Sequence, residues 1–235
     1  MRVAAWGLVA IVAAMILALH VRAQADDASP FPSPSPETTQ VPGSGGYAVF
    51  GVAALSASGG EVAGPGASAT PVSFHSATAS GYSLELLGRL SPSYETTLHF
   101  EDANLHGADA SVESRFDVSV LYQFAARDTA VGIGYASLQR STIQSSANGF
   151  GAGVALLPRF DRRASPYASF FYYPGLTAAG GVRSGLSVFR LGLVVTPPNS
   201  TGLFARIGAS AQSYGARTFS PTSLSGVEIG VGTYF

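Results

Sequence analysis

Six residues that could perform acid–base chemistry lie close together in the middle of the chain. They are His99, Glu101, Asp102, His106, Asp109 and Glu113. A histidine beside a carboxylate can act as a general base that activates water. The same residue types can also coordinate a divalent metal ion. Their irregular spacing favours a hydrated polar network over a catalytic centre or a metal site.

No recognised catalytic motif accompanies this cluster. The sequence contains no G-x-S-x-G, H-E-x-x-H, P-loop or EF-hand pattern. The glycine-rich runs GIGYAS and GFGAGV are not followed by a helical pattern, so neither predicts a phosphate cradle. The chain has no cysteine, which excludes thiolate catalysis, cysteine metal ligands and disulfides. We therefore expect no catalytic residue, no metal and no cofactor.

The charged residues are few and unusual in type. They make up 11% of the chain, whereas an ordinary soluble domain has about 25%. All 13 basic residues are arginine, against 14 acidic residues, and the formal net charge is −1. This balance offers no basic stripe to neutralise phosphates, so nucleic acid is not an expected partner. A surface facing water would carry unusually few charges.

Apolar and polar residues alternate repeatedly from residue 47 to the C-terminus, and no stretch keeps a helical repeat. The alternation predicts about ten strands, with eight as the alternative if hairpins merge. A strand that crosses a bilayer at a tilt needs about 9–11 residues, which suits these segments. The predicted strands span residues 47–56, 79–90, 94–104, 114–124, 129–140, 147–157, 166–174, 185–196, 201–213 and 225–235.

The connections alternate in length. The short or compact ones span residues 91–93, 125–128, 158–165 and 197–200, and the longer ones 57–78, 105–113, 141–146, 175–184 and 215–224. Short turns on one rim and longer loops on the other are typical of membrane-spanning barrels. The sequence therefore predicts an all-β fold: an antiparallel up-and-down transmembrane β-barrel with both ends of the barrel domain on the short-turn rim.

The charged residues of the strands fall on one face. In residues 114–124, for example, Arg115 and Asp117 alternate with Phe116 and Val118. Asp102 is the exception, and we expect it at a strand end. In a membrane barrel such residues would fill the lumen with ion pairs and hydrogen bonds. This predicted lumen network consists of Glu85, Arg89, Glu95, His99, Glu101, Glu113, Arg115, Asp117, Arg190, Arg206 and Glu228.

A soluble barrel with the same alternation would bury the apolar face instead. Its wet face would then carry several glycines and few charges, so we favour an apolar face that contacts lipid. Aromatic residues near the strand ends would form two interfacial girdles. These are Tyr94, Tyr122, Phe124 and Phe235 towards the turn rim, and Phe100, Phe116, Tyr135 and Phe189 nearer the loop rim.

The last strand, SGVEIGVGTYF, places an apolar face opposite one that mixes a charge with glycines, and it stops on phenylalanine. It resembles the closing strand of bacterial outer-membrane β-barrels, whose terminal phenylalanine and alternating apolar positions are read by the barrel-assembly machinery. The resemblance implies that the protein is located in the outer membrane and contacts its lipids. It also implies an assembly signal at Val227, Ile229, Val231, Thr233 and Phe235.

Two segments precede the predicted barrel domain of residues 47–235. Residues 1–25 begin with Met1-Arg2, continue with an apolar run and end at Ala23-Gln24-Ala25, which predicts a secretory signal peptide. An uncleaved membrane anchor is the alternative, because the run is nearly long enough to span a bilayer. Residues 26–46 are rich in proline and serine and predict a disordered linker.

Three functions suit such a barrel. The first is a structural or surface-interaction role with a filled lumen, as in small barrels that resemble OmpA or OmpX. The second is a narrow porin-like channel. The third is a protease similar to omptins, which are ten-stranded barrels with an Asp–His pair at the rim, but their paired motifs have no residue-by-residue match here. We prefer the first, without enzymatic activity, because small barrels are filled by their own side chains. The sequence does not identify an extracellular ligand.

Overall fold

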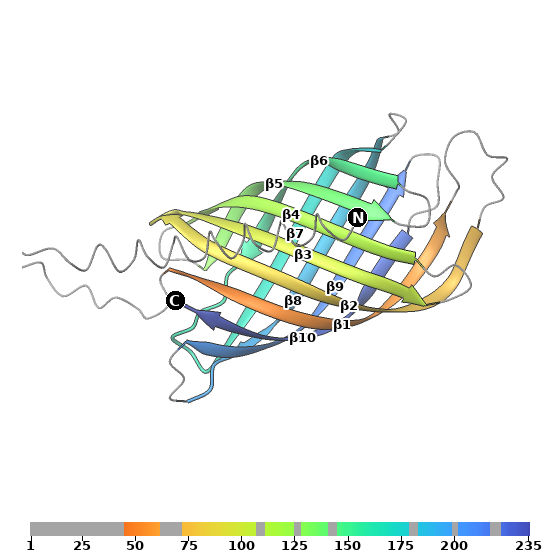
Figure 1. Ribbon diagram of the computed structural model, residues 1–235. Coiled ribbons are helices and arrows are strands. Elements are labelled where there is room, and N and C mark those ends of the chain that lie inside the picture. The colour runs from red at the N-terminus through yellow and green to blue at the C-terminus, as the bar shows by residue number, and fades with distance from the viewer. Residues whose placement is uncertain are drawn as a thin grey trace, which may run out of the picture. The chain divides into compact units, whose positions relative to one another are not determined.

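The chain forms a closed antiparallel β-barrel of ten strands (Figure 1). The computed structural model describes residues 45–61, 72–106, 111–124, 128–140, 145–178, 183–198, 202–216 and 222–235. The predicted signal peptide and all but two residues of the predicted linker lie outside these ranges. The prediction of a ten-stranded up-and-down barrel is confirmed, and the alternative of eight strands is wrong.

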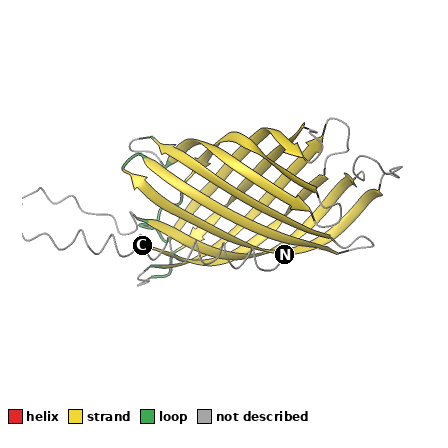
Figure 2. Ribbon diagram, turned by 45° about the horizontal axis from the view of Figure 1, so that its top comes forward, coloured by secondary structure: helices red, strands yellow, loops and turns green. Residues whose placement is uncertain are grey.

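Each strand pairs with its neighbours in sequence, and β1 pairs with β10 to close the barrel. The strands are β1 Gly46–Glu61, β2 Val72–Ser91, β3 Tyr94–His106, β4 Ser111–Gln123, β5 Thr129–Arg140, β6 Ser145–Leu156, β7 Ala164–Ala178, β8 Arg183–Val195, β9 Leu203–Ala216 and β10 Thr222–Tyr234. Figure 2 shows them tilted around a common axis. Within the described ranges, no helix is long and apolar enough to cross a membrane.

The first residues of the barrel and its last residue join the two closing strands. Ile229 lies opposite Val52, and Tyr234 lies opposite Tyr47. The backbone N–H groups of Gly45 and Gly46 donate to the carbonyl oxygen of Phe235 at 2.9 and 3.0 Å, and the Phe235 N–H donates to Gly46. Closure leaves no free sheet edge along this seam, which removes the usual route to edge-to-edge association.

The first hairpin is longer than predicted. The sequence favoured a loop over residues 57–78, but β1 continues to Glu61 and β2 already begins at Val72, where the two residues pair. Pairing between β1 and β10 stops at Ser58. The hairpin therefore extends past β10 at the loop rim (Figure 1).

The two faces of the wall differ sharply in chemistry. Large apolar side chains are exposed on the outside, with Ile133, Phe150 and Val231 showing 69%, 75% and 67% of their surface. Phe50, Tyr82 and Phe100 form one row of neighbouring rings, with centroid distances of 6.5 and 6.1 Å, and Tyr94, Tyr122 and Phe124 form another. An apolar band bordered by aromatic rings is the surface that a transmembrane barrel offers to lipid.

The lumen is filled in layers. An apolar layer at the turn rim includes Tyr47, Leu121, Val194 and Phe204. Two further apolar clusters lie towards the loop rim, one around Leu55 and Leu105 and the other around Tyr173 and Leu186. The charged residues occupy the space between these layers.

Candidate functional site

Most members of the predicted lumen network lie buried inside the barrel. Six acidic residues are buried with three arginines and His99, and the side chain of Arg89 is 36% exposed. Strand alternation explains this, because residues of one parity along each strand point to one face. The buried members are Glu85, Glu95, His99, Glu101, Glu113, Arg115, Asp117, Arg190, Arg206 and Glu228.

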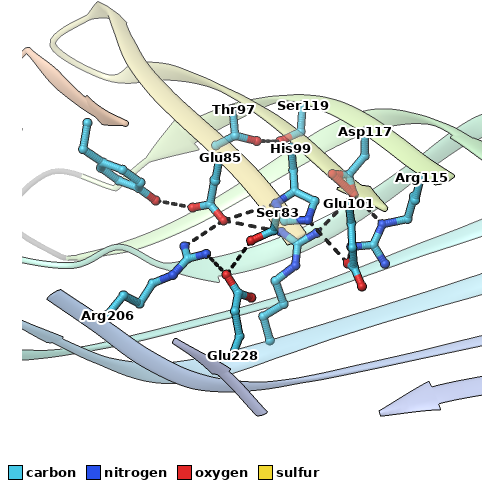
Figure 3. Close-up of polar contacts among 12 residues, drawn as sticks. Ser83, Glu85, Thr97, His99, Glu101, Arg115, Asp117, Ser119, Arg206 and Glu228 are labelled. Carbon is cyan, nitrogen blue, oxygen red and sulfur yellow. Dashed lines mark hydrogen bonds and ion pairs between the residues drawn. The ribbon is translucent and has the colours of Figure 1, made fainter. Parts of the chain in front are cut away.

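Arg206 on β9 holds two carboxylates from other strands (Figure 3). Its Nη1 donates to Glu85 Oε2 at 3.0 Å, and its Nη2 donates to Glu228 Oε1 at 2.5 Å. The hydroxyl of Tyr47 donates to Glu85 at 2.5 Å, and that of Ser83 donates to Glu228 at 2.6 Å. Both carboxylates therefore receive one charged and one neutral donor, which is what a buried carboxylate requires.

Arg115 and Arg190 extend the network along the lumen. Arg115 Nη2 donates to Glu101 Oε2 at 2.6 Å, and its Nε lies 3.5 Å from Asp117 Oδ1. The same Asp117 oxygen accepts from Arg190 Nη2 at 3.4 Å. Arg190 Nη1 also lies 3.7 Å from Glu85 Oε2, which connects this group to Arg206. The arginines and carboxylates thus alternate in one continuous chain.

His99 lies between two carboxylates of this chain. Its Nδ1 is 3.5 Å from Glu85 Oε2, and its Nε2 is 3.5 Å from Glu101 Oε2. The side chain is 2% exposed. The imidazole therefore lies between the Arg206 and Arg115 ends of the network.

Nearer the turn rim, Arg89 and Glu95 form a pair, with Arg89 Nε 4.0 Å from Glu95 Oε1. Towards the loop rim, Gln212 extends the network: it accepts a hydrogen bond from Arg115 and donates one to Glu113. The network therefore links β1 to β4 with β8, β9 and β10 across the lumen.

The six-residue cluster from which the sequence suggested acid–base chemistry does not stay together. His99, Glu101 and Glu113 point inward, whereas Asp102 and His106 lie on the outer face. Asp109 is outside the described residues. In the described part of the chain, no three histidine or carboxylate side chains converge as metal ligands would. The barrel wall therefore separates Asp102 and His106 from His99, Glu101 and Glu113.

Asp102 also differs from its predicted place at a strand end. Strand β3 continues to His106, so Asp102 lies well within it. On the outer face its carboxylate accepts from the Tyr82 hydroxyl at 2.8 Å and from the Ser114 hydroxyl at 3.2 Å. His106 is paired in the same way with Ser80 at 2.9 Å. These neutral partners satisfy the two polar side chains on the outer surface.

Sequence reasoning missed several residues that complete the site. Tyr47, Ser83 and Gln212 donate hydrogen bonds to carboxylates in the lumen, and Gln212 also accepts one from Arg115. Parity along their strands could have placed them inside. It could not have shown their partners, because these lie on strands as distant in sequence as β2 and β10.

The turn between β6 and β7 adds a residue that no alternation predicts. Phe160 packs against Tyr234, Phe204 and Tyr47, with ring centroids 4.8, 5.0 and 5.6 Å apart. All four rings belong to the apolar layer at the turn rim. Phe160 therefore folds back over the barrel mouth.

Comparisons with known proteins give similarity of shape only. No protein-family model and no curated protein sequence matches this chain. Neisserial surface protein A is 14% identical over 82% of this chain and 98% of that one, with a TM-score of 0.43. An outer-membrane channel from Pseudomonas putida F1 is 10% identical over 86% and 100%, with a TM-score of 0.43. The outer-membrane protease OmpT from Escherichia coli is 11% identical over 86% and 100%, with a TM-score of 0.36. The fold is therefore established by the strand pairing of this barrel itself.

Proposed function

We propose that this protein is an integral outer-membrane barrel with a filled lumen, and that it acts structurally or through surface contacts at its loop rim. The apolar outer band and its aromatic borders support contact with membrane lipids. The resemblance of the last strand to barrel assembly signals supports insertion by the assembly machinery. A lumen that conducts nothing leaves the outer surface and the loops as the parts that can meet a partner.

The observation that carries this proposal is the filling of the lumen by the protein's own side chains. Arginine–carboxylate contacts cross the interior, with Arg206 joined to both Glu85 and Glu228. Apolar layers lie on both sides of the network along the barrel. Open aqueous channels appear in barrels of about 16 strands, and about eight strands leave only enough room for side chains. Ten strands with this filling favour a closed barrel over a porin-like channel.

Recordings on the purified protein in planar lipid bilayers test the proposal. We expect no steady single-channel steps from the unmodified barrel. Replacing Glu101, Arg115, Arg190 and Arg206 together by alanine removes the centre of the network, and we expect either conductance or loss of the folded barrel. Heat-modifiability on gels reports folding in both samples, because a closed barrel stays compact in detergent until it is boiled. Steady steps from the folded, unmodified protein would contradict a filled lumen.

A further inference from the structure

A small chamber lies inside the barrel between the ion network and the turn rim. Its volume is about 50 Å³, and Glu85, His99, Asp117 and Arg190 line its polar side. Leu157 and Pro158, from the segment that joins β6 to β7, line it as well. We propose that this chamber is an internal water site and that the β6–β7 turn is the lid that closes it from the turn rim.

The polar lining of the chamber favours bound water. Both ring nitrogens of His99 and the Nε of Arg190 are buried without a hydrogen-bond partner in the protein. Buried polar atoms are almost always satisfied by protein or by ordered water. One water needs about 10–15 Å³ of such space and two to four polar partners. The chamber therefore has room for a cluster of about three or four waters.

Water also suits the mixture of groups better than an ion does. The lining offers carboxylates as acceptors, the Arg190 guanidinium as donor, and hydroxyls such as those of Thr97 and Ser119, which do both. A water molecule both donates and accepts hydrogen bonds, so it can bridge any two of these groups. The carboxylates of Glu85 and Asp117 would repel an anion, and the guanidinium of Arg190 would repel a cation.

Residues 157–163, the proposed lid, are held to their surroundings by hydrogen bonds and an ion pair. The Leu157 N–H donates to the Asp128 carbonyl at 2.7 Å, the Arg159 N–H donates to the Ser165 hydroxyl at 2.7 Å, and the Thr196 N–H donates to the Arg163 carbonyl at 3.0 Å. Arg159 Nη1 also lies 3.8 Å from Asp128 Oδ1. Phe160 then fills the mouth by packing among Tyr47, Phe204 and Tyr234. On the far side, the apolar cluster of Tyr173, Leu186 and Val188 separates the chamber from the loop rim. Exchange of water should therefore depend on the turn.

Cysteine labelling tests the lid directly, because the chain contains no cysteine of its own. Ser169 on β7 lines the chamber. In Ser169→Cys we expect slow reaction with a charged methanethiosulfonate reagent in detergent. Adding Phe160→Ala should speed labelling about tenfold or more, equivalent to making the opening of the lid easier by about 1.4 kcal/mol. Phe160→Leu keeps an apolar plug and should label slowly.

The controls separate a lid effect from unfolding. Thr129 is exposed near the turn rim. A cysteine introduced by Thr129→Cys should react at the same rate whether or not the Phe160→Ala substitution is also present. Heat-modifiability must show folded barrels in every sample. Equal labelling of Ser169→Cys in the presence and absence of Phe160 would overturn the lid. The lid rests on the filled lumen proposed above: conductance from the unmodified barrel contradicts that filled lumen, whereas equal labelling in a silent barrel contradicts the lid alone.

A high-resolution crystal structure tests the water site itself. We expect ordered waters within hydrogen-bond distance of the His99 ring and of Arg190 Nε. A chamber occupied by detergent, or one closed by direct side-chain contacts, would overturn the water site. The labelling experiment does not depend on this result, so the lid and the water can fail separately.

Discussion

At the scale of single residues, the lumen depends on a few arginines that are shared by several carboxylates. Arg206 contacts Glu85 and Glu228, and its guanidinium also lies 5.3 Å from the centre of the Tyr167 ring. Six acidic residues and three arginines are buried in the interior. Arg206 is the arginine that pairs with Glu228, so removing Arg206 leaves this carboxylate in the interior without that partner.

Arg206→Ala should therefore destabilise the barrel strongly. Breaking a buried ion pair from one side costs about 3–5 kcal/mol, because the remaining charge stays buried and uncompensated. Urea unfolding in detergent micelles measures the change. Arg183→Ala is the matched control: Arg183 is exposed on β8, and a surface substitution should change stability by less than about 0.5 kcal/mol. Equal effects of the two substitutions would show that the network does not stabilise the fold.

Asp161, in the turn that we propose as the lid, should titrate at an unusually low pH. Hydrogen bonds from the Arg159 guanidinium hold the pKa of the Asp161 carboxyl below its ordinary value. Because the folded-state pKa is depressed, the pair's contribution to stability is complete above the ordinary aspartate range and is lost as the pH falls through the folded pKa. NMR titration of the carboxyl should show this low midpoint, and Arg159→Gln should return it to the ordinary range. An unchanged midpoint in the variant would contradict the pairing.

At the scale of elements, one part of the wall is built from glycines that receive large rings. Gly151 and Gly153 on β6 face the lumen beside Tyr173 and Phe171 on β7. A Cβ at Gly153 would lie 2.5 Å from Cγ of Phe171, which is closer than packed atoms allow. Absence of a side chain on β6 is what lets the rings of β7 lie against the neighbouring strand and fill the lumen.

Gly153→Ala should consequently destabilise the barrel. Adding atoms to a filled interior typically costs about 1–3 kcal/mol, because rings or backbone must shift. Gly175→Ala on β7 is the control, since nothing lies within 4 Å of an added Cβ there. Urea unfolding should show a lower midpoint for the first variant only. If both variants unfold like the parent, the backbone of Phe170 and the ring of Phe171 can both shift, and the glycine wall is not a packing requirement.

The closing strand β10 carries the residues that we predict to act as an assembly signal. Val227, Ile229 and Val231 are exposed on the outer face, and Phe235 is joined by backbone hydrogen bonds to Gly45 and Gly46. Their role as an assembly signal stays a prediction from the resemblance. Phe235→Ala keeps the backbone bonds, so we expect normal refolding in detergent and a smaller inserted fraction in cells. Loss of refolding in vitro would point instead to a structural role for the ring.

At the scale of the whole molecule, the decisive property is which face of the wall meets the membrane. Exposed apolar residues surround the barrel, while charged residues lie inside it. A water-soluble barrel would instead expose a polar outer face. Polar outer residues such as Asp102 and Ser114 lie nearer the loop rim than the ring of Phe116, which suggests the level at which the lipid-facing band ends.

Arginine substitutions on the outer face test this orientation. Arginine near the bilayer midplane costs a barrel about 2–4 kcal/mol, whereas near the interface it costs about 0–1 kcal/mol. Ile133 is 69% exposed within the apolar band of β5, and Gln139 is exposed nearer the loop rim of the same strand. Ile133→Arg should lower the stability of the barrel in lipid vesicles much more than Gln139→Arg. Equal small effects would show that water, not hydrocarbon, contacts the outer face.

The sequence alone predicted about ten strands, with eight as the alternative, and it predicted which connections form the turn rim and which strand residues share the charged face. These features are local: alternation along a strand and the length of the next connection can be read without knowing what lies opposite. The same local pattern misplaced the ends of the first hairpin. It also grouped Asp102 and His106, which lie on the outer face, with residues that point into the lumen.

Only the tertiary structure decided which side chains meet. Arg206 reaches Glu85 on β2, and Phe160 folds from a turn over the barrel mouth. Such contacts depend on how the closed sheet curves and on the stagger between strands, because these set which inward residues lie at the same level across the lumen. The spacing of residues along the chain does not specify their height along the barrel axis. The positions of the ion network and of the chamber beside it therefore follow only from the closed barrel.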